Sequence, residues 1–306
     1  IIDKSETINK FNNNNSLSDL NNAFTNKSFK ILVKNGYQLE KPLIIYHITN
    51  SDIWSKNINL RLDFELSKDS SLRLIDLYND TSEKNFLNIF YNFDLKENAV
   101  LKNYKVDKLE NKNIKYSFNN IEQDKNSISE TFILSSGSNF FKNEINCNLK
   151  GGYSSAFVNG ILSLNNDKHH EIRTIINHLT ENTKSYQLIK SVLDDNSKSV
   201  YQGKIFVNSE AQKTDGYQLS KAILLNKDSE FNAKPELEIY ADDVKCSHGS
   251  ASGSLSEDSI FYLMSRGLNY QQSRELLING FLLDVVENIT DSEIKNLIKN
   301  MIGIKE

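Results

Sequence analysis

Short runs of alternating apolar and polar residues, separated by polar turns, dominate the chain from about residue 29 to residue 240. Residues 60–66 alternate strictly, and a period of two places every second side chain on one face of a β-strand. Similar runs predict strands at residues 29–33, 43–46, 72–77, 131–134, 172–179, 205–207 and 237–240. Many short strands with few helices indicate a sandwich, a barrel or an irregular stacked solenoid.

After Gly249 the spacing of the apolar residues changes to that of an α-helix. Residues 247–256 are small and polar and predict a flexible connector. Three amphipathic helices should follow, each with recognisable capping residues. The expected caps are Ser256 with Gly267 as the C′ residue for the first helix, Asn269 with Gln272 for the second, and Thr290 with Glu293 for the third.

These patterns divide the chain into three parts. Residues 1–24 form a polar lead-in, in which Leu20, Ala23 and Phe24 predict one short amphipathic turn. Residues 25–249 form the β body, and residues 250–306 form a C-terminal helical domain. Because the sequence begins with Ile rather than Met, it leaves open whether the N-terminus is truncated.

Composition excludes several classes of protein. The net charge of −4 and the absence of a basic block argue against nucleic acid as the main ligand. No apolar run approaches the roughly 20 residues of a membrane helix, and no secretion signal opens the chain. Two cysteines exclude a disulfide framework and favour a reducing compartment such as the cytosol.

Common catalytic signatures are incomplete. Gly203-Lys204 lacks the earlier glycine of a phosphate-binding loop, and Thr174 breaks a zinc-protease motif that would begin at His170. His169, His170 and His178 lie in one stretch, but His170 and His178 would stand roughly 26 Å apart along a straight strand. We therefore interpret these histidines as hydrogen-bonded or exposed side chains rather than as ligands of one metal.

Cys246 and His248 form a different kind of pair. Two residues apart in extended backbone, they project to one side with Cα atoms roughly 6.5–7 Å apart. Thiolate and imidazole are ligands of iron and zinc. Two cysteines cannot hold an ordinary four-thiolate cluster, so further ligands would have to come from a second chain. The alternative is a packed cysteine beside a surface histidine.

The sequence around this pair resembles the SufD branch of the SufB/SufD family of the SUF iron–sulfur cluster assembly system. The resemblance extends from Lys234 through Cys246-Ser247-His248-Gly249 to the segment at residues 261–267. Upstream blocks at residues 171–174, 203–205 and 213–216 match in the same order, and a weaker match lies at residues 20–24. The chain is shorter than typical members, so we expect the family's N-terminal helical domain to be absent or reduced.

The resemblance implies a mainly β fold, a right-handed parallel β-helix followed by a C-terminal α-helical domain. It implies a non-enzymatic scaffold that pairs with SufB and binds the ATPase SufC, with a transient iron–sulfur cluster at the SufB interface. His248 matches a family position used in cluster assembly, and Cys246 is its neighbour. No ATP would bind this chain. Whether reduced FAD binds the complex, and whether the isolated chain forms a homodimer, stay open.

The resemblance also assigns ATPase docking to the C-terminal helices. The expected docking residues are Phe261, Leu263, Met264, Arg266, Gly267, Leu277 and Phe281. Packing of these helices against the β body is the alternative, and both can hold because a helix has more than one face. Two other functions stay open: a carbohydrate-active β-helix enzyme using Asp242-Asp243 or Glu236 and Glu238, and a structural paralogue that stabilises SufB without a ligand role.

Overall fold

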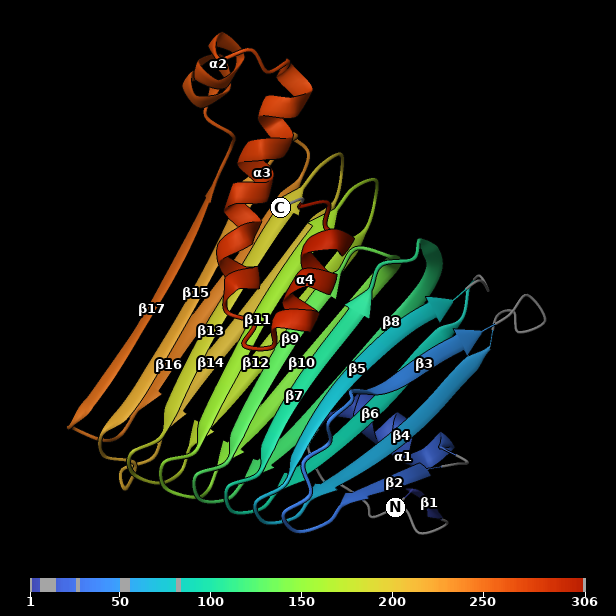
Figure 1. Cartoon of the computed structure of the whole chain (residues 1–306), viewed down its shortest axis with the longest axis vertical. Coiled ribbons are helices and arrows are strands. Elements are labelled where there is room, and N and C mark those ends of the chain that lie inside the picture. Colours follow the sequence, from blue (N-terminus) through green and yellow to red (C-terminus); the bar gives the residue numbers. More distant parts are fainter. Residues whose placement is uncertain (1, 6–14, 26–27, 50–55, 81–83, 305–306) are drawn as a thin grey trace.

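The computed structural model describes residues 2–5, 15–25, 28–49, 56–80 and 84–304, and its body is a parallel β-helix (Figure 1). Each turn adds one strand to each of two stacked sheets, and all pairs are parallel except β1 with β2. The nine-stranded sheet contains, in spatial order, β1 (Ile2–Ser5), β2 (Ser28–Val33), β4 (Asn57–Leu66), β6 (Phe86–Leu95), β8 (Asn111–Gln123), β10 (Ser138–Leu149), β12 (His169–His178), β14 (Lys198–Val207) and β16 (Glu230–Ile239). The eight-stranded sheet contains β17 (Val244–Gly253), β15 (Thr214–Leu224), β13 (Lys184–Leu193), β11 (Ser155–Leu164), β9 (Ile128–Ser135), β7 (Val100–Asp107), β5 (Ser71–Asp80) and β3 (Leu43–Thr49).

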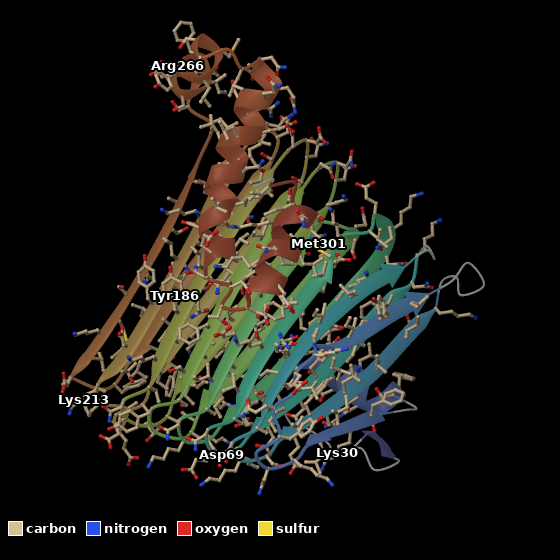
Figure 2. All side chains as sticks on the ribbon, in the orientation of Figure 1. Lys30, Asp69, Tyr186, Lys213, Arg266 and Met301 are labelled. Carbon is tan, nitrogen blue, oxygen red and sulfur yellow. The ribbon has the colours of Figure 1, made fainter. Side chains whose placement is uncertain are left out.

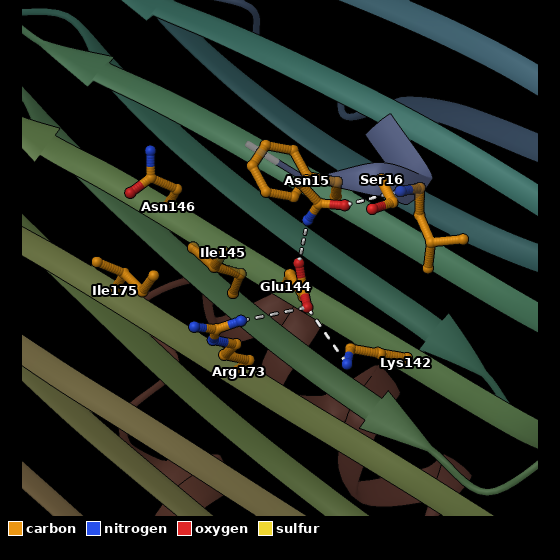
Figure 3. Close-up of a pocket in the computed structure, with 10 residues that line it drawn as sticks. Asn15, Ser16, Lys142, Glu144, Ile145, Asn146, Arg173 and Ile175 are labelled. Atoms are coloured by element: carbon orange, nitrogen blue, oxygen red, sulfur yellow. Dashed lines mark hydrogen bonds and ion pairs between the residues drawn. The ribbon is translucent and has the colours of Figure 1, made fainter. Parts of the chain in front are cut away.

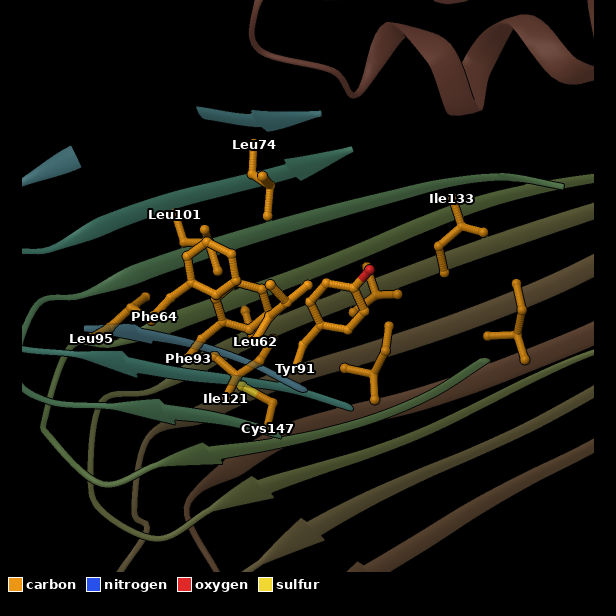
Figure 4. Close-up of a cluster of buried hydrophobic side chains, with 14 of the residues drawn as sticks. Leu62, Phe64, Leu74, Tyr91, Phe93, Leu95, Leu101, Ile121, Ile133 and Cys147 are labelled. Atoms are coloured by element: carbon orange, nitrogen blue, oxygen red, sulfur yellow. The ribbon is translucent and has the colours of Figure 1, made fainter. Parts of the chain in front are cut away.

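The space between the two sheets, called the lumen below, is filled over much of its length by stacked apolar side chains (Figure 4). Residues in register on neighbouring strands share a face, so Phe64 on β4 stacks on Phe93 on β6 with ring centroids 4.8 Å apart. Cys147 is buried in this core and is not bonded to Cys246. The stacked solenoid, one of three architectures that the strand pattern allowed, is therefore the one that forms.

The turns that follow the nine-stranded sheet use asparagine and aspartate where many proteins use glycine. Asp69, Asn98, Asn126 and Asn182 all have φ of 58° or 59°, in the left-handed region that these two residue types tolerate. Their side chains also bond from one turn to the next: Asn98 Nδ2 donates to Asp69 Oδ1 at 2.6 Å, and Asn126 Nδ2 donates to Asn98 Oδ1 at 3.0 Å. This substitution explains how a chain with only 12 glycines builds so many tight turns.

The predicted flexible connector at residues 247–256 is wrong over most of its length. Residues 244–253 form β17, the last strand of the eight-stranded sheet, in register with β15 from Thr214 to Ile223. The small, polar composition suggested a linker, but the free edge of β15 supplies backbone partners that local sequence cannot reveal.

Four helices complete the fold: α1 (Ser16–Phe24), α2 (Glu257–Ser265), α3 (Tyr270–Glu287) and α4 (Ser292–Met301). The predicted turn near Leu20 exists as α1, but Phe24 is exposed and the buried residues are Ser18 and Asn21. Asn21 Nδ2 donates to the backbone oxygen of Asn88 at 2.8 Å. The helix thus docks on the outer face of the nine-stranded sheet both by polar contacts, which an apolar pattern does not predict, and by packing of Leu17 on an aromatic cluster of the sheet.

The predicted caps of the C-terminal helices are confirmed for α2 and α3. Ser256 Oγ accepts from Ser259 N, Gly267 has φ of +98°, and Asn269 with Gln272 forms a complete capping box. The predicted cap of the third helix is wrong. Asp291, not Thr290, caps α4, because its carboxylate accepts from the backbone of Glu293 and Ile294. Thr290 instead donates to Glu130 Oε2 at 2.8 Å on the adjacent sheet.

The C-terminal half of α3 and all of α4 lie on the outer face of the eight-stranded sheet (Figure 1). Their buried side chains pack on residues of the sheet that would otherwise be exposed. The residues of α3, α4 and the turn between them are Leu282, Val285, Val286, Ile289, Ile294 and Ile298, and the sheet residues are Ile75, Tyr104, Val106, Phe132, Leu134, Ile161, Leu188 and Val192. Helix α2 lies beyond the carboxyl end of β17, away from the sheets.

Candidate functional site

The β-helix is open at the end formed by β16 and β17, because these are the terminal strands of their sheets. Alternate residues of β15 are buried and face the lumen, among them Gly216 and Gln218. The register pairs Gly216 with Cys246 and Gln218 with His248, so both members of the predicted pair also face the lumen. No further turn covers β17, and His248 is therefore lumen-facing yet exposed. The prediction that the two side chains share one face is confirmed.

Cys246 occupies an apolar environment. It is half-buried against the cluster of Ile205, Val207, Ala211 and Ala241, and a Cβ at Gly216 would lie 3.3 Å from its Sγ. Burial raises the pKa of the Cys246 thiol, and the backbone of Gly216 opposes this only in part. A protonated, packed thiol is a weak ligand for metal. The geometry therefore favours His248 over Cys246 as the accessible donor.

Cys246 and His248 have no third candidate metal ligand beside them among the described residues. Among the residues that the structure describes, no group of three His, Cys, Asp or Glu side chains could hold a metal ion. Since iron in an iron–sulfur cluster needs several donors, any cluster bound at His248 would require groups from a second molecule.

The three other histidines of the sequence prediction do not gather. His170 and His178 are both buried at opposite ends of β12, as expected for histidines that do not share a metal. His170 contacts Ser135 Oγ at 2.8 Å and the backbone oxygen of Ser138 at 2.7 Å. His178 contacts Thr183 Oγ1 at 2.7 Å and Ser185 Oγ at 2.9 Å. His169 Nε2 lies 3.2 Å from Glu171 Oε1.

The two buried histidines make stability depend on pH. Burial lowers the pKa of His170 and of His178 to about 4 each, whereas an unfolded histidine titrates near 6.5. The unfolded chain therefore binds more protons between these values, and stability is lost as the pH falls from about 7 towards 4. We expect each residue to remove ~2 kcal/mol from the free energy of unfolding between pH 7.5 and pH 5. Urea titrations at both pH values measure this, and His178→Gln should reduce the difference; an unchanged difference contradicts the assignment.

A buried network of charges lies in the lumen, and the sequence prediction missed it. Asp76 on β5 accepts from Lys105 Nζ at 2.8 Å and contacts His47 Nε2 at 2.5 Å. Burial by itself would raise the pKa of Asp76, but Lys105 and His47 outweigh it and hold the pKa well below its usual range. The ammonium of Lys105 also lies 3.4 Å from the ring centroid of Tyr91. The sequence offered one signal for this network, a charged residue at an inward-facing position of a strand in which apolar and polar residues alternate.

A cavity of about 450 Å³ lies on the outer face of the nine-stranded sheet beside the start of α1 (Figure 3). Its central group is Glu144, whose Oε2 accepts from Asn15 Nδ2 at 2.7 Å and from the Tyr116 hydroxyl at 2.8 Å. Lys142 lies 3.4 Å from the other carboxylate oxygen. Because these groups bond to one another, they hold α1 on the sheet.

The predicted docking residues fall into two groups. Phe261 is 74% exposed and Met264 is 43% exposed on α2, where Arg266 also projects into solvent (Figure 2). Leu263 and Leu277 are half-buried, and Gly267 is exposed. Phe281 instead packs against the β body, where Lys190 Nζ lies 4.4 Å from its ring centroid. Tyr262 on α2, and Tyr270 and Leu276 on α3, are further large apolar side chains exposed in this region, and the sequence prediction left them out.

Comparisons with known proteins agree with this architecture. Residues 47–281 match the family model described as "SUF system FeS cluster assembly, SufBD core domain". The chain is 29% identical over 280 residues to "Iron-sulfur cluster assembly protein SufD" of Escherichia coli, an alignment that covers 89% of this chain and 65% of the relative. It is 43% identical over 77 residues to "Protein ABCI7, chloroplastic" of Arabidopsis thaliana, covering 25% of the chain and 16% of the relative. It is 38% identical over 82 residues to a Synechocystis protein called "Iron-sulfur cluster assembly SufBD family protein slr0076", covering 27% and 18%.

The fold and these matches define the class of protein, a chain built on the core domain described for SUF system FeS cluster assembly. The chain belongs to the SufBD core family, whose matched region runs from β3 into α3. Its matched part spans less than two thirds of the length of each of these three relatives. None of the helices that the structure describes combines the length and apolar character needed to cross a membrane.

Proposed function

We propose that this chain is a non-enzymatic scaffold subunit of the SUF assembly complex, and that His248 contributes an imidazole ligand to a cluster in transit. The observation that carries the proposal is the exposed position of His248 on the lumen face of an uncovered last turn, in a member of the SufBD core family. The nascent cluster is cargo, held by one imidazole here and by thiolates of the partner, so that it can leave. The proposed location is the cytoplasm.

The proposed partner at the open end is SufB, a homologous β-helix. Strands β16 and β17 are terminal in their sheets, and an uncovered strand edge carries backbone groups that can pair with another chain. Leu237 and Val244 add apolar surface beside Cys246 at this end. A second β-helix seated here would bring its ligands close to His248. A homodimer of the isolated chain would use the same edges.

The proposed partner at α2 is the ATPase SufC. The patch around Phe261 and Met264 projects beyond the β body, whereas α3 and α4 are anchored to the sheet by their buried residues. A rigid anchor and an exposed apolar tip suit a subunit that must transmit the movement of an ATPase. ATP would bind SufC and not this chain, and reduced FAD, if the complex uses it, would bind the assembled complex.

Replacement of the imidazole tests the proposal. For His248→Ala co-expressed with SufB and SufC, we expect an intact complex in which cluster content falls about tenfold or more. Loss of a residue that only supports a metal ligand already lowers metal affinity by about 10–100-fold, and loss of the ligand itself should cost at least as much. Bound iron and the visible absorption of the purified complex measure the effect. His169→Ala, an exchange of a half-buried histidine on the outer face of β12, is the matched control. Normal cluster content in intact His248→Ala complexes would leave the purely structural role as the better description.

The carbohydrate-active alternative has no support from the geometry. A general acid for glycoside cleavage needs a raised pKa. The pKa of Glu236 is lowered by Lys234, and the pKa of Glu238 is lowered by Lys204 and Tyr240. Asp242 and Asp243 are exposed on the turn between β16 and β17. These carboxylates therefore do not favour an enzymatic role.

A further inference from the structure

A column of three inward-facing side chains leads from the interior of the β-helix to His248. The register pairs Gln187 with Gln218 and Gln218 with His248, on β13, β15 and β17. Neighbouring strands are about 4.8 Å apart, so side chains in register on one face are direct neighbours. Both glutamines are fully buried, whereas His248 is exposed. Gln218 is thus the interior neighbour of His248.

The amide of Gln218 is incompletely bonded. Its Nε2 makes one long hydrogen bond of 3.4 Å to the backbone oxygen of Glu236, and its Oε1 is buried with no hydrogen-bond donor among the described residues. Gly203 on the opposite sheet makes room for it, since a Cβ there would lie 2.4 Å from both Gln218 Oε1 and the Tyr201 hydroxyl. A buried amide oxygen without a donor is unfavourable and uncommon in folded proteins.

A neutral imidazole at His248 needs what the Gln218 amide can supply, a hydrogen-bond acceptor. If one ring nitrogen gives its lone pair to iron, the other carries a hydrogen and needs an acceptor, and histidine ligands of metals nearly always have one. Two residues along β17, Ser250 Oγ already accepts from Ser220 Oγ at 3.1 Å. The thiol of Cys246 lies in the apolar cluster. Gln218, in register with His248, is therefore the candidate acceptor on this face, although its Oε1 lies beside Gly203 and the Tyr201 hydroxyl in this conformation.

We propose that Gln218 is a positioning residue for His248: its Oε1 accepts the ring N–H of His248 and so fixes the tautomer whose other nitrogen faces the open end. This requires the amide to turn end for end. The turn gives up the 3.4 Å hydrogen bond to the backbone oxygen of Glu236 and places Nε2 beside the Tyr201 hydroxyl. That hydroxyl can accept, since it donates to Gln187 Oε1 at 3.1 Å. The purpose of the contact rests on the proposed function of His248, but the contact itself belongs to this chain alone.

The tautomer of His248 tests the contact directly. The chain is labelled with ¹⁵N-histidine, and two-bond proton–nitrogen correlations are recorded at a pH where its five histidines are neutral. The signals of His248 are identified by their loss in His248→Ala. We expect one predominant tautomer in the unsubstituted chain and a change of about fivefold in the tautomer ratio in Gln218→Leu, the size expected for loss of one neutral hydrogen bond. Gln218→Glu, which keeps an acceptor, should retain the bias.

Asn103→Leu is the matched control, because Asn103 is an equally buried, inward-facing amide on β7, away from the column of Gln187, Gln218 and His248. It should leave the His248 signals unchanged, which separates a contact with His248 from general loosening of the lumen. Equal tautomer ratios in the unsubstituted chain and in Gln218→Leu would overturn the inference; Gln218→Met serves for the same comparison should the leucine variant fold poorly. The proposed function is tested by a different measurement. Normal cluster content in the intact His248→Ala complex would contradict it, whatever the tautomer ratios show.

Discussion

Lys105→Met should lower the free energy of unfolding by about 3 kcal/mol or more. The substitution keeps an apolar chain of similar length but leaves the Asp76 carboxylate, which is fully buried, without its lysine partner. Breaking a buried ion pair from one side costs about 3–5 kcal/mol, because the remaining charge has neither water nor a partner. Burial lowers the pKa of Lys105 while Asp76 opposes that shift, so each charge depends on the other. Urea denaturation at pH 7.5 measures the loss.

Two comparisons isolate the cause. Lys105→Met combined with Asp76→Asn should be less destabilised than Lys105→Met alone, because the buried negative charge is removed with its partner. Lys68→Met removes a cation from an exposed pair with Glu97 and should leave the urea midpoint nearly unchanged. A Lys105→Met chain as stable as the unsubstituted chain would show that His47 and the tyrosine hydroxyls suffice to stabilise Asp76.

Replacement of Phe261 and Met264 together by alanine should weaken binding of the ATPase at least about 30-fold. Large exposed apolar side chains at the centre of an interface commonly contribute about 2 kcal/mol or more each to binding. Both residues lie on α2, which is well capped by Ser256, and alanine preserves helix propensity. The folded structure should therefore survive the change. Co-purification with SufC and titration calorimetry on the purified chains measure the effect.

Tyr46→Ala is the control for this surface. Tyr46 lies on β3 at the far end of the β-helix and is 55% exposed, so its removal deletes a comparable aromatic surface at a distant place. It should leave ATPase binding intact. Point substitutions are preferable to removal of all three helices, because α3 and α4 cover apolar residues of the eight-stranded sheet. Undiminished binding by the folded double variant would move the docking site elsewhere.

The strand content was predictable because alternation is a local signal. Strictly alternating residues 60–66 lie within β4, and the shorter runs overlap observed strands. The strands that carry inward charges or amides were harder to predict. On β7, for example, the buried face carries Asn103, Lys105 and Asp107, although an alternating pattern predicts apolar residues at buried positions. Only the partner strands, which supply Asp76 and Lys115, make these positions acceptable.

The candidate site, too, was predictable only in part. The spacing of Cys246 and His248 predicted a shared face, and the register with β15 confirms it. The different surroundings of the two side chains were not predictable, because Cys246 packs on Ile205 and its neighbours from another part of the chain. The same holds for Gln218, which no motif distinguishes until its neighbours on the opposite sheet are known.

The sequence by itself determined the β content, the helical C-terminus with two of its three caps, and the one-sided Cys–His pair, since each depends on contacts within a few residues. Periodicity left the stacking of the strands open, and only the family resemblance implied a β-helix. The tertiary structure alone decided that residues 247–253 form a strand, that α3 and α4 lie on one sheet, and that the end bearing His248 is open. Those outcomes depend on pairing between segments far apart in the chain, where the backbone finds its hydrogen bonds and the apolar faces find their partners.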